Sequence, residues 1–465
     1  MRHDCGVTHY DLAVIGTGSG NTVVTHLFKD WGRIAIIEEN LFGGTCLNVG
    51  CIPTKMFVYP ADLARNAGHG PELGVDTSFD GARWPEIRDR IFGRIDPMAR
   101  DGEAYRRRLP NIDVYDEHCT FVDDHTLTLH SKEGGSRGRI TADQIVIAAG
   151  SRVHVADVPG LDEVEFHTSD TVMRLPELPR RMTIVGGGYV AAEFAHVFSA
   201  LGTEVTQLER GPRLLRHQDE DISRTFTELA ARQWDVRLET TAARVEKSGP
   251  ATVVHLSDGS ELETDVLLMA TGRVSNADRL GLEHTSIEVR DGRVVVDDHQ
   301  RTTVEGIWAL GDVSSEYQLK HVANHEADVV RHNLLHPDDL VSSDHRFVPA
   351  AVFTSPQIAR VGLTSQGARE QGIEHRSVIH DYATIAYGWA MESPPGEQYV
   401  KLLATPDGHE LLGAHVIGPQ ASLLLQPLVQ AISLGTPLAR MARNQYWIHP
   451  SMAEVVENAV LKLID

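Results

Sequence analysis

Short apolar runs alternate with amphipathic stretches along most of the chain. Near the N-terminus the run Leu12–Ile15 leads into a glycine-rich turn, and a second run, Ile34–Ile37, ends at Glu38. The runs Thr183–Val185 and Glu204–Leu208 repeat this order about 170 residues later. An apolar strand, a glycine turn, an amphipathic segment and a second strand form the pattern of a βαβ unit. The sequence therefore predicts an α/β fold with two such units.

Further apolar runs indicate how these units are connected. Gln144–Arg152 and Val266–Arg273 are predicted strands that end in small residues, and we expect the chain to cross between domains there. A third strand, Gly306–Leu310, ends in Gly311 and Asp312. Near the C-terminus the strands AAVFT and LLGAHVIG alternate with the apolar helix SLLLQPLVQAISLG, which predicts an α+β domain without a nucleotide fingerprint.

Length and charge narrow the class of protein. A chain of 465 residues exceeds what one hydrophobic core supports and favours two or three domains. The net charge of −22, from 43 basic and 65 acidic residues, disfavours nucleic acid or an anionic membrane as a partner. No apolar run reaches the roughly 18 residues of a membrane span, and the N-terminus lacks a secretory signal. We therefore expect a cytoplasmic location.

The first glycine turn has the features of a dinucleotide fingerprint. Gly16 permits the tight turn, and Gly18 lets the backbone approach a pyrophosphate. Glu38 ends the second strand, where a carboxylate can accept the ribose hydroxyls. Asn21 takes the third glycine position, but Gly20 beside it supplies a small residue. We predict nucleotide binding here.

The second turn repeats the fingerprint with Gly186, Gly188 and Ala191, and its second strand ends at Glu209. Alanine is compatible with the third position, which requires close packing of helix on strand. Two fingerprints in one chain imply two dinucleotides, and an FAD with a nicotinamide cofactor is the economical interpretation.

Three residues after the second fingerprint bear on the choice of nicotinamide. Glu209 is the acid typical of an NAD site, whereas Arg210 and Arg216 could bind a 2′-phosphate. Two cations outweigh one carboxylate that can turn to solvent. We predict NADPH, with some use of NADH.

Residues 43–55 read GGTCLNVGCIPTK and place Cys46 and Cys51 five positions apart. On a regular helix such positions lie roughly 8.6 Å apart between Cα atoms, beyond the roughly 7 Å that a disulfide tolerates. The spacing leaves open a structural bridge, a metal pair, two unrelated thiols and a redox couple on a distorted helix. Residues that allow irregular backbone surround the pair: Gly43, Gly44, Gly50 and Pro53. They predict an irregular first turn of the helix.

Together these segments resemble the disulfide-reducing pyridine nucleotide flavoenzymes, such as glutathione reductase and dihydrolipoamide dehydrogenase. The resemblance runs nearly end to end and rests on GTGSGN, GGTCLNVGCIPTK, VGGGYVAAE, ATGRVSNAD, ALGDVS and WIHPSMAE. It implies two Rossmann-like dinucleotide-binding domains, for FAD and NADPH, and a C-terminal α+β dimerisation domain. The implied bounds are 1–152 and 274–340 for the FAD domain, 153–273 for the NAD(P)H domain and 345–465 for the interface domain.

The resemblance also assigns chemistry. Cys51 would be the charge-transfer thiol nearest the flavin, and Cys46 the interchange thiol that attacks the substrate disulfide. His449 would protonate the leaving thiolate, with Glu454 fixing its tautomer. Family members supply this histidine from the partner subunit, so a homodimer is implied. The remaining cysteines, Cys5 and Cys119, form no second close pair that would complete a zinc site.

Two further residues receive roles by resemblance. Lys55 would lie beside flavin N5 and pair with Glu193, and Tyr189 would cover the flavin until the nicotinamide arrives. The residues expected at FAD are Gly16, Gly18, Ser19, Gly20, Glu38, Gly44, Thr45, Lys55, Gly150, Gly311 and Asp312. Those expected at NADPH are Gly186, Gly188, Tyr189, Glu193, Glu209, Arg210, Arg216 and Gly272.

The substrate is predicted from three segments. Phe92–Arg107, Ala386–Glu392 and Tyr446–Pro450 are most similar to an actinobacterial branch of the family, which acts on a large, polar disulfide of little net charge. Asp328 stands where glutathione reductases place a glutathione-binding arginine, which argues against glutathione disulfide. Candidate lining residues are Arg94, Tyr105, Arg106, Tyr446 and Trp447.

Other interpretations explain less of the sequence. Dihydrolipoamide dehydrogenase is favoured by Glu209 and opposed by Arg210 and Arg216. Mercuric reductases and large thioredoxin reductases need C-terminal redox residues, but no cysteine follows Cys119. A flavin-binding protein without turnover could have lost the cysteines, Lys55 or His449, yet all are present.

Overall fold

The computed structural model describes residues 7–465. The chain folds as two compact units, each assembled from three segments. The first unit comprises the chain up to Pro53, Asp89–His154 and Arg273–His345, and the second comprises Thr54–Arg88, Val155–Gly272 and Arg346–Asp465. Helices α3 (Cys51–His69) and α4 (Trp84–Arg107) contain two of the points where the chain passes between units. The three-domain division given above stays a prediction.

A seven-stranded sheet forms the centre of the first unit. Its strands follow the order β3 (Ile112–Tyr115), β2 (Ile34–Ile37), β1 (Thr8–Ile15), β6 (Ser136–Ile147), β5 (Thr126–His130) and β4 (His118–Asp123), and β18 (Ile307–Ala309) pairs with β6. The pairs β3·β2, β2·β1, β1·β6 and β18·β6 are parallel, and β6·β5 and β5·β4 are antiparallel. Both fingerprint strands predicted here, Leu12–Ile15 and Ile34–Ile37, are therefore confirmed.

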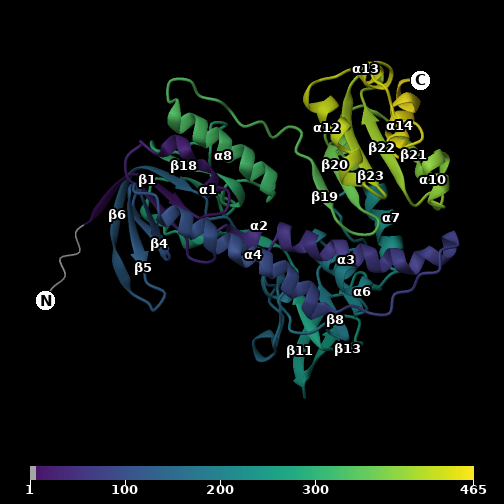
Figure 1. The fold of residues 1–465 in the computed structure, drawn as a ribbon, viewed down its shortest axis with the longest axis horizontal. Coiled ribbons are helices and arrows are strands. Elements are labelled where there is room, and N and C mark those ends of the chain that lie inside the picture. The colour runs from purple at the N-terminus through teal and green to yellow at the C-terminus, as the bar shows by residue number, and fades with distance from the viewer. Residues whose placement is uncertain (1–6) are drawn as a thin grey trace. The chain divides into compact units, whose positions relative to one another are not determined.

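The alternation of side chains along β1 explains why this sheet is buried on both faces. Ala13 and Ile15 belong to one apolar cluster, whereas Leu12 and Val14 belong to another. The second cluster includes Val330 and other residues of α8 (Lys320–Leu335), a long helix labelled beside β18 in Figure 1. The remaining elements of this unit are α1 (Gly20–Val23), α2 (Gly44–Asn48), and the antiparallel pairs β7 (Ser151–Val153) with β15 (Arg273–Ser275) and β16 (Val289–Arg290) with β17 (Arg293–Val294).

The second unit contains three sheets. One is parallel, in the order β10 (Asp235–Arg237), β9 (Glu204–Leu208), β8 (Arg181–Val185) and β14 (Val266–Met269). The second is an antiparallel meander of β11 (Ala242–Ser248), β12 (Ala251–Leu256) and β13 (Glu261–Thr264). The third is antiparallel, in the order β19 (Ala350–Val352), β20 (Ile358–Gly362), β23 (Leu411–Ile417), β22 (Tyr399–Ala404) and β21 (Arg376–Asp381).

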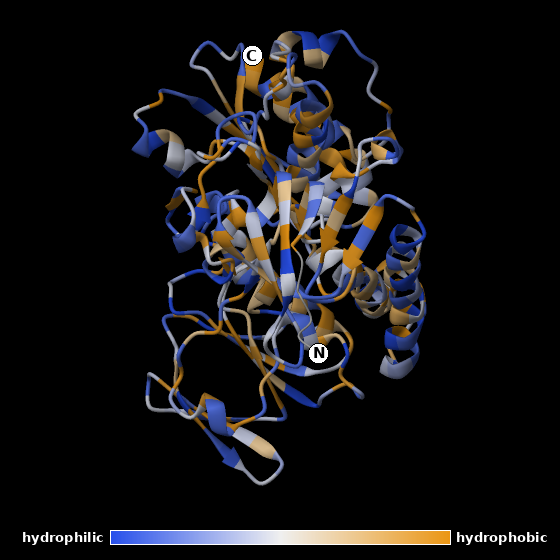
Figure 2. Cartoon of the chain, turned by 90° about the vertical axis from the view of Figure 1, so that its left-hand side faces the viewer, coloured by the Kyte–Doolittle hydropathy of each residue, from blue (hydrophilic) through white to orange (hydrophobic). Residues whose placement is uncertain are grey.

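Helices pack on these sheets through apolar faces. Val456 and Val460 of α14 (Glu454–Ile464) and Leu428 of α12 (Gln426–Ser433) join Leu402 and Val416 in one buried cluster. Figure 2 shows apolar stretches along several strands. The other helices of this unit are α5 (Ser169–Val172), α6 (Tyr189–Ala200), α7 (Glu220–Ala230), α9 (Ser365–Glu370), α10 (Ala386–Ala390), α11 (Ala421–Leu424) and α13 (Leu438–Arg443).

The structure shortens some predicted elements. The expected strand Gln144–Arg152 is two strands, because β6 ends at Ile147 and Gly150 turns the chain with a φ of 67° before β7. The expected single helix over SLLLQPLVQAISLG is two helices, α11 and α12, separated at Leu425. The 3₁₀ turns are η1 (His26–Phe28), η2 (Gly70–Leu73), η3 (Leu161–Glu163), η4 (Asn276–Arg279), η5 (Leu282–His284), η6 (Gly311–Val313) and η7 (Tyr382–Thr384).

Candidate active site

The cysteine motif forms two helices in place of one. Cys46 lies in α2, and Cys51 is the first residue of α3. The chain leaves helical geometry at Val49, with a φ of −142°, and a side chain at Gly50 would come within 2.9 Å of the Thr45 carbonyl oxygen. The expected irregular first turn is therefore confirmed, and the break changes the relation between the cysteines from that on a regular helix.

The break brings the two thiols together. Cys46 and Cys51 are in the thiol form, and a hydrogen bond joins their side chains. This hydrogen bond raises the pKa of Cys46, burial raises it further, and the charge of Lys320 opposes both. Cys119 is buried in an apolar cluster of the sheet, where desolvation raises its pKa to about 12. The structure therefore distinguishes a close pair from an inert core thiol.

The first glycine turn lies against the start of this motif. Gly16 has a φ of 98°, and a side chain there would overlap the Ala148 carbonyl oxygen. Gly44 packs on Gly18, since a Cβ on Gly44 would lie 2.7 Å from the Gly18 Cα. A Cβ on Gly18 itself would meet nothing within 4 Å. The turn thus leaves room for a phosphate-bearing ligand at Gly18 while it packs closely elsewhere.

Glu38 is held at the end of β2 by the same turn. Its Oε2 accepts hydrogen bonds from the Thr17 backbone nitrogen at 2.9 Å and the Thr17 hydroxyl at 2.6 Å, and its Oε1 accepts one from the Asn40 nitrogen at 2.9 Å. The Thr17 hydroxyl also accepts a hydrogen bond from the Gly43 nitrogen at 2.9 Å. These bonds connect the acid, the glycine turn and the cysteine motif.

Asp312 lies just beyond the end of β18. Its carboxylate accepts a hydrogen bond from the Ser151 hydroxyl at 2.6 Å, and Arg273 Nε donates to the same hydroxyl at 2.8 Å. The preceding Gly311 nitrogen donates to Glu326 at 2.6 Å. Burial raises the pKa of Glu326 to about 7. Sequence reasoning missed Glu326, because this residue of helix α8 belongs to no recognisable motif.

Sequence reasoning also missed Lys320, the first residue of α8. Its Nζ donates to the Ser19 hydroxyl at 2.8 Å, and Ser19 in turn donates to Asn324 at 3.1 Å. Its position eight residues after Asp312 follows no spacing rule, and only the packing of α8 on the glycine turn reveals it.

In the second unit Lys55 and Glu193 form the expected pair. Lys55 Nζ lies 2.8 and 2.7 Å from the two carboxylate oxygens of Glu193. Glu193 is 3% exposed and also accepts a hydrogen bond from the Phe353 nitrogen at 2.9 Å. A buried carboxylate that accepts three hydrogen bonds, two of them from Lys55, holds Lys55 in a fixed position. The place of Lys55 beside flavin N5 stays a prediction.

The second glycine turn repeats the geometry of the first. Gly186 has a φ of 134°, and a side chain there would overlap the Ala270 carbonyl oxygen. A Cβ on Gly188 would meet nothing within 4 Å, and Tyr189 begins α6 with 43% of its surface exposed. Glu209 accepts a hydrogen bond from the Gly211 nitrogen at 2.7 Å, so its carboxylate stays at the turn.

Arg210 and Arg216 are both exposed on the loop between β9 and α7. The loop is fixed on its inner side, where the Leu215 nitrogen donates to the Gly187 carbonyl at 2.8 Å. It ends at Asp219, whose side chain caps α7. The loop therefore carries two exposed arginines, and its inner side is bonded to the glycine turn.

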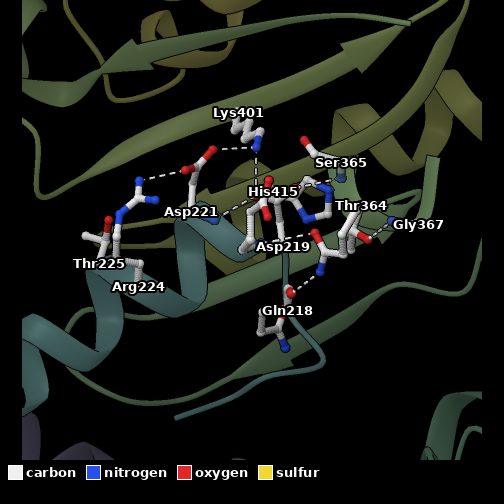
Figure 3. Close-up of polar contacts among 12 residues, drawn as sticks. Gln218, Asp219, Asp221, Arg224, Thr225, Thr364, Ser365, Gly367, Lys401 and His415 are labelled. Atoms are coloured by element: carbon white, nitrogen blue, oxygen red, sulfur yellow. Dashed lines mark hydrogen bonds and ion pairs between the residues drawn. The ribbon is translucent and has the colours of Figure 1, made fainter. Parts of the chain in front are cut away.

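A buried ion-pair network holds the end of this loop (Figure 3). Lys401 Nζ lies 2.8 Å from Asp219 Oδ1 and 2.6 Å from Asp221 Oδ2. The other oxygen of Asp219 accepts a hydrogen bond from the Ser365 nitrogen at 2.8 Å. Despite burial, these partners and the nearby His415 lower the pKa of Asp219 to about 2. Burial lowers the pKa of His415 to about 4, so it is neutral at pH 7.

His449 precedes α14, the C-terminal helix. Its Nδ1 lies 2.7 Å from Glu454 Oε1, and its side chain is 73% exposed. Glu454 also accepts a hydrogen bond from the Ser451 nitrogen at 3.1 Å, and the pair with His449 lowers the pKa of Glu454. With Nδ1 committed to the carboxylate, Nε2 is the nitrogen suited to proton transfer.

The candidate substrate residues differ in environment. Tyr446 is fully exposed, and Arg94 and Tyr105 are exposed, whereas Trp447 donates to the Ala442 carbonyl at 3.2 Å. Arg106 was a wrong candidate. It is 9% exposed, and its guanidinium donates to the side chain and backbone oxygens of Asn21 and to the Val24 carbonyl. These bonds satisfy the C-terminal carbonyls of the short helix α1.

Comparison with known proteins agrees with this geometry. The model of the family "pyridine nucleotide-disulphide oxidoreductase" matches residues 10–327, and the model of its dimerisation domain matches residues 348–460. The chain belongs to the pyridine nucleotide-disulphide oxidoreductases. It is thus an oxidoreductase that carries a dimerisation domain, and FAD and NADPH, the cofactors expected from the sequence, are those of this family.

Individual members of the family cover nearly the whole chain. Mycothione reductase of Mycobacterium tuberculosis is 51% identical over 458 residues, which are 98% of this chain and 99% of that protein. Dihydrolipoyl dehydrogenase of Halobacterium salinarum is 32% identical and covers 97% of this chain and 96% of its own length. The solved Cu(II) complex of the flavoprotein disulfide reductase RclA from Escherichia coli is 29% identical, with a TM-score of 0.86 over 98% of this chain and 100% of that chain.

Two kinds of feature are absent from the described residues. No helix within residues 7–465 combines the length and the apolar character needed to cross a membrane. Across the same residues, the side chains of His, Cys, Asp and Glu form no group of three or more suited to a metal ion.

Proposed function

We propose that the chain is an NADPH-dependent reductase of mycothione, the disulfide of mycothiol. The observation that carries this proposal is the 51% identity to mycothione reductase over nearly both full lengths, against 32% to a dihydrolipoyl dehydrogenase. The three segments that favoured this substrate in the sequence, with Asp328 in place of a glutathione-binding arginine, support it. The balanced reaction converts NADPH, a proton and one disulfide into NADP⁺ and two thiols.

The residues of the two glycine turns would bind the cofactors. Gly16, Gly18, Glu38 and Asp312 are suited to FAD, and Gly188 with Arg210 and Arg216 is suited to NADPH. FAD supplies the transfer of two electrons from the nicotinamide to the cysteine pair. Lys55, held by Glu193, offers a fixed positive charge for that transfer.

The cysteines carry out the exchange. The Cys46 thiolate attacks one sulfur of the substrate, forms a mixed disulfide with it and releases the other thiol as a thiolate, which takes a proton from His449. Cys51 then attacks the Cys46 sulfur, which releases the second thiol and forms the Cys46–Cys51 disulfide. Two electrons reduce that disulfide for the next turnover.

We assign His449 to the active site of the partner subunit in a homodimer, and we place the enzyme in the cytoplasm. The exposed imidazole and its tautomer-fixing bond to Glu454 support the first assignment. The match of residues 348–460 to the model of a dimerisation domain supports the homodimer.

Initial rates with NADPH and NADH against mycothione, glutathione disulfide and lipoamide test the proposal. We expect kcat/KM to be highest for mycothione with NADPH. A preference for lipoamide with NADH would instead make the chain a dihydrolipoamide dehydrogenase.

A further inference from the structure

The loop between β9 and α7 contains a backbone conformation that a free loop would avoid. Leu215 has a φ of 53°, in the left-handed region that a leucine rarely adopts. Its side chain is 4% exposed, its nitrogen donates to the Gly187 carbonyl at 2.8 Å, and its carbonyl accepts from the Gln218 nitrogen at 2.8 Å. A strained residue of this kind persists only where its surroundings hold it. The exposed Arg216 follows directly, so its backbone starts from this held position.

A buried ion pair holds the end of the loop. Asp219 Oδ1 accepts a hydrogen bond from the Asp221 nitrogen at 3.1 Å, which caps α7, and lies 2.8 Å from Lys401 Nζ. Lys401 Nζ also lies 2.6 Å from Asp221 Oδ2, and Figure 3 shows this ammonium bonded to both carboxylates. The remaining oxygen of Asp219 accepts from the Ser365 nitrogen at 2.8 Å. The carboxylate of Asp219 is therefore fixed from three directions.

The residues on either side of Asp219 are bonded to a second distant segment. Gln366 Nε2 donates to the Gln218 carbonyl at 2.8 Å, and Gln366 Oε1 accepts from the Glu220 nitrogen at 3.1 Å. Gln366 belongs to α9, whereas Lys401 belongs to β22 of the antiparallel third sheet. Three consecutive residues at the end of the loop are therefore held by parts of the chain far away in the sequence.

Stability alone does not explain why this pair is charged. The side chains of Lys401 and Asp219 are 4% and 0% exposed. Removal of two charges from water costs much of what their attraction returns, and a well-packed apolar pair of similar volume is often as stable. A charged pair does impose one geometry, because each buried charge must stay opposite its partner. Fixed geometry is therefore what this pair adds to the loop.

We propose that Asp219 and Lys401 are positioning residues for the nicotinamide cofactor, which hold the loop so that Arg210 and Arg216 together reach the 2′-phosphate of NADPH. The inference deepens the proposed function and rests on the choice of NADPH in it. The pair acts through the loop and not by contact with the cofactor. A loop held in its binding conformation loses less conformational entropy when the ligand arrives, which strengthens binding.

The test compares the dissociation constants of NADP⁺ and NAD⁺ in variants of the FAD-loaded enzyme. Lys401→Met alone would leave two carboxylates without their shared cation, which can prevent folding. The decisive variant therefore combines Lys401→Met with Asp219→Asn, because asparagine removes the charge but keeps an oxygen that accepts from the Asp221 nitrogen. Lys462→Met is the matched control, since Lys462 of α14 donates to the Ile379 carbonyl at 3.0 Å. FAD absorbance and thermal unfolding report folding.

Hydrogen–deuterium exchange of residues 210–218, measured without nicotinamide, reports whether the pair holds the loop. In the double variant we expect exchange there to become roughly tenfold faster. The dissociation constant of NADP⁺ should rise roughly tenfold and that of NAD⁺ by less than about twofold. Lys462→Met should match wild type in both measurements.

Three results would overturn the proposal: an unchanged exchange rate, an unchanged ratio of the two dissociation constants, or a double variant that does not fold, which would assign the pair to stability. Failure of the proposed function has a different signature. A wild-type enzyme that binds NAD⁺ as tightly as NADP⁺ would contradict the choice of NADPH itself, before any variant is compared.

Discussion

At the scale of single residues, chemistry in this protein depends on how neighbours fix a few side chains. Cys46 and Cys119 are both cysteines, but the side chain of Cys46 hydrogen-bonds with a second thiol whereas Cys119 is enclosed in an apolar cluster. Glu454 and Glu193 likewise each hold one basic group, His449 and Lys55, in one orientation. Reactivity therefore follows from surroundings and not from residue type.

Cys46→Ser tests the assignment of the interchange thiol. Serine cannot form the mixed disulfide, so we expect reduction of a disulfide substrate to be abolished while FAD stays bound and reducible by NADPH. Anaerobic bleaching of the flavin absorbance and steady-state turnover measure the two properties separately. Retained turnover would exclude Cys46 as the attacking thiol.

At the scale of elements, the glycine turns show two different uses of glycine. Gly16 is required by the fold, because its φ is positive and a side chain would overlap the Ala148 backbone. Gly18 is not required in this way, since a Cβ there meets nothing within 4 Å. The open space at Gly18 can therefore accept a ligand.

The pair Gly16→Ala and Gly18→Ala separates these uses. Gly16→Ala should lower the stability of the apoprotein by about 1–3 kcal/mol, because it introduces backbone strain. Gly18→Ala should leave that stability unchanged but weaken FAD binding roughly tenfold or more, because the added methyl group blocks the pyrophosphate. Thermal unfolding and FAD titration of the apoproteins distinguish the two, and wild-type affinity in Gly18→Ala would contradict an FAD cradle here.

The loop that carries Arg210 and Arg216 tests the choice of nicotinamide. Replacement of both by alanine removes two cations that can bind a 2′-phosphate, which NADH lacks. We expect KM for NADPH to rise far more than KM for NADH, with kcat changed little. Arg213→Ala, on the same loop, is the matched control. An equal effect on both cofactors would remove the pair from the phosphate site.

At the scale of the whole molecule, the proposed active site requires two chains. Cys46 and His449 belong to different units of one chain, and the proposal joins Cys46 of one subunit to His449 of the partner subunit. His449→Ala should slow turnover by about 10²–10⁴, the usual loss for a general acid.

Heterodimers test the sharing directly. A dimer of one Cys46→Ser chain and one His449→Ala chain contains one complete site, because the intact Cys46 faces the intact His449 of the other chain. Two differently tagged chains, co-expressed and purified in tandem, should recover about half of the wild-type activity, one of two sites. If each chain used its own histidine, the heterodimer would be as inactive as the Cys46→Ser and His449→Ala homodimers.

Acid stability also belongs to the whole fold. The pKa of His415 is lowered from 6.5 to about 4 by burial, so unfolding below pH 6.5 takes up a proton. His415 therefore contributes stability above pH 6.5 that is lost as the pH falls toward 4, with a slope of up to about 1.4 kcal/mol per pH unit. Denaturant unfolding from pH 7 to 4 should show a smaller slope in His415→Asn than in wild type, whereas the exposed His26→Asn should match wild type. Identical slopes would contradict a buried neutral His415.

The sequence by itself determined the βαβ units, the two fingerprints and the family, because these depend on local spacing that a folded chain must keep. The strand Ile34–Ile37 and the irregular turn between Cys46 and Cys51 followed from apolar runs and glycines alone. The resemblance to the family also implies the pairs Lys55–Glu193 and His449–Glu454, which the structure contains.

Only the tertiary structure decided what each charge meets. Arg106 is a candidate substrate residue in the sequence, but in the structure its guanidinium donates hydrogen bonds to Asn21 and Val24 at the end of helix α1. Lys320 and the buried pair Asp219–Lys401 follow no motif, because their partners lie 301 and 182 positions away in the sequence. Electrostatic roles arise from distances in space and from exclusion of water, and neither quantity is written in the order of residues along the chain.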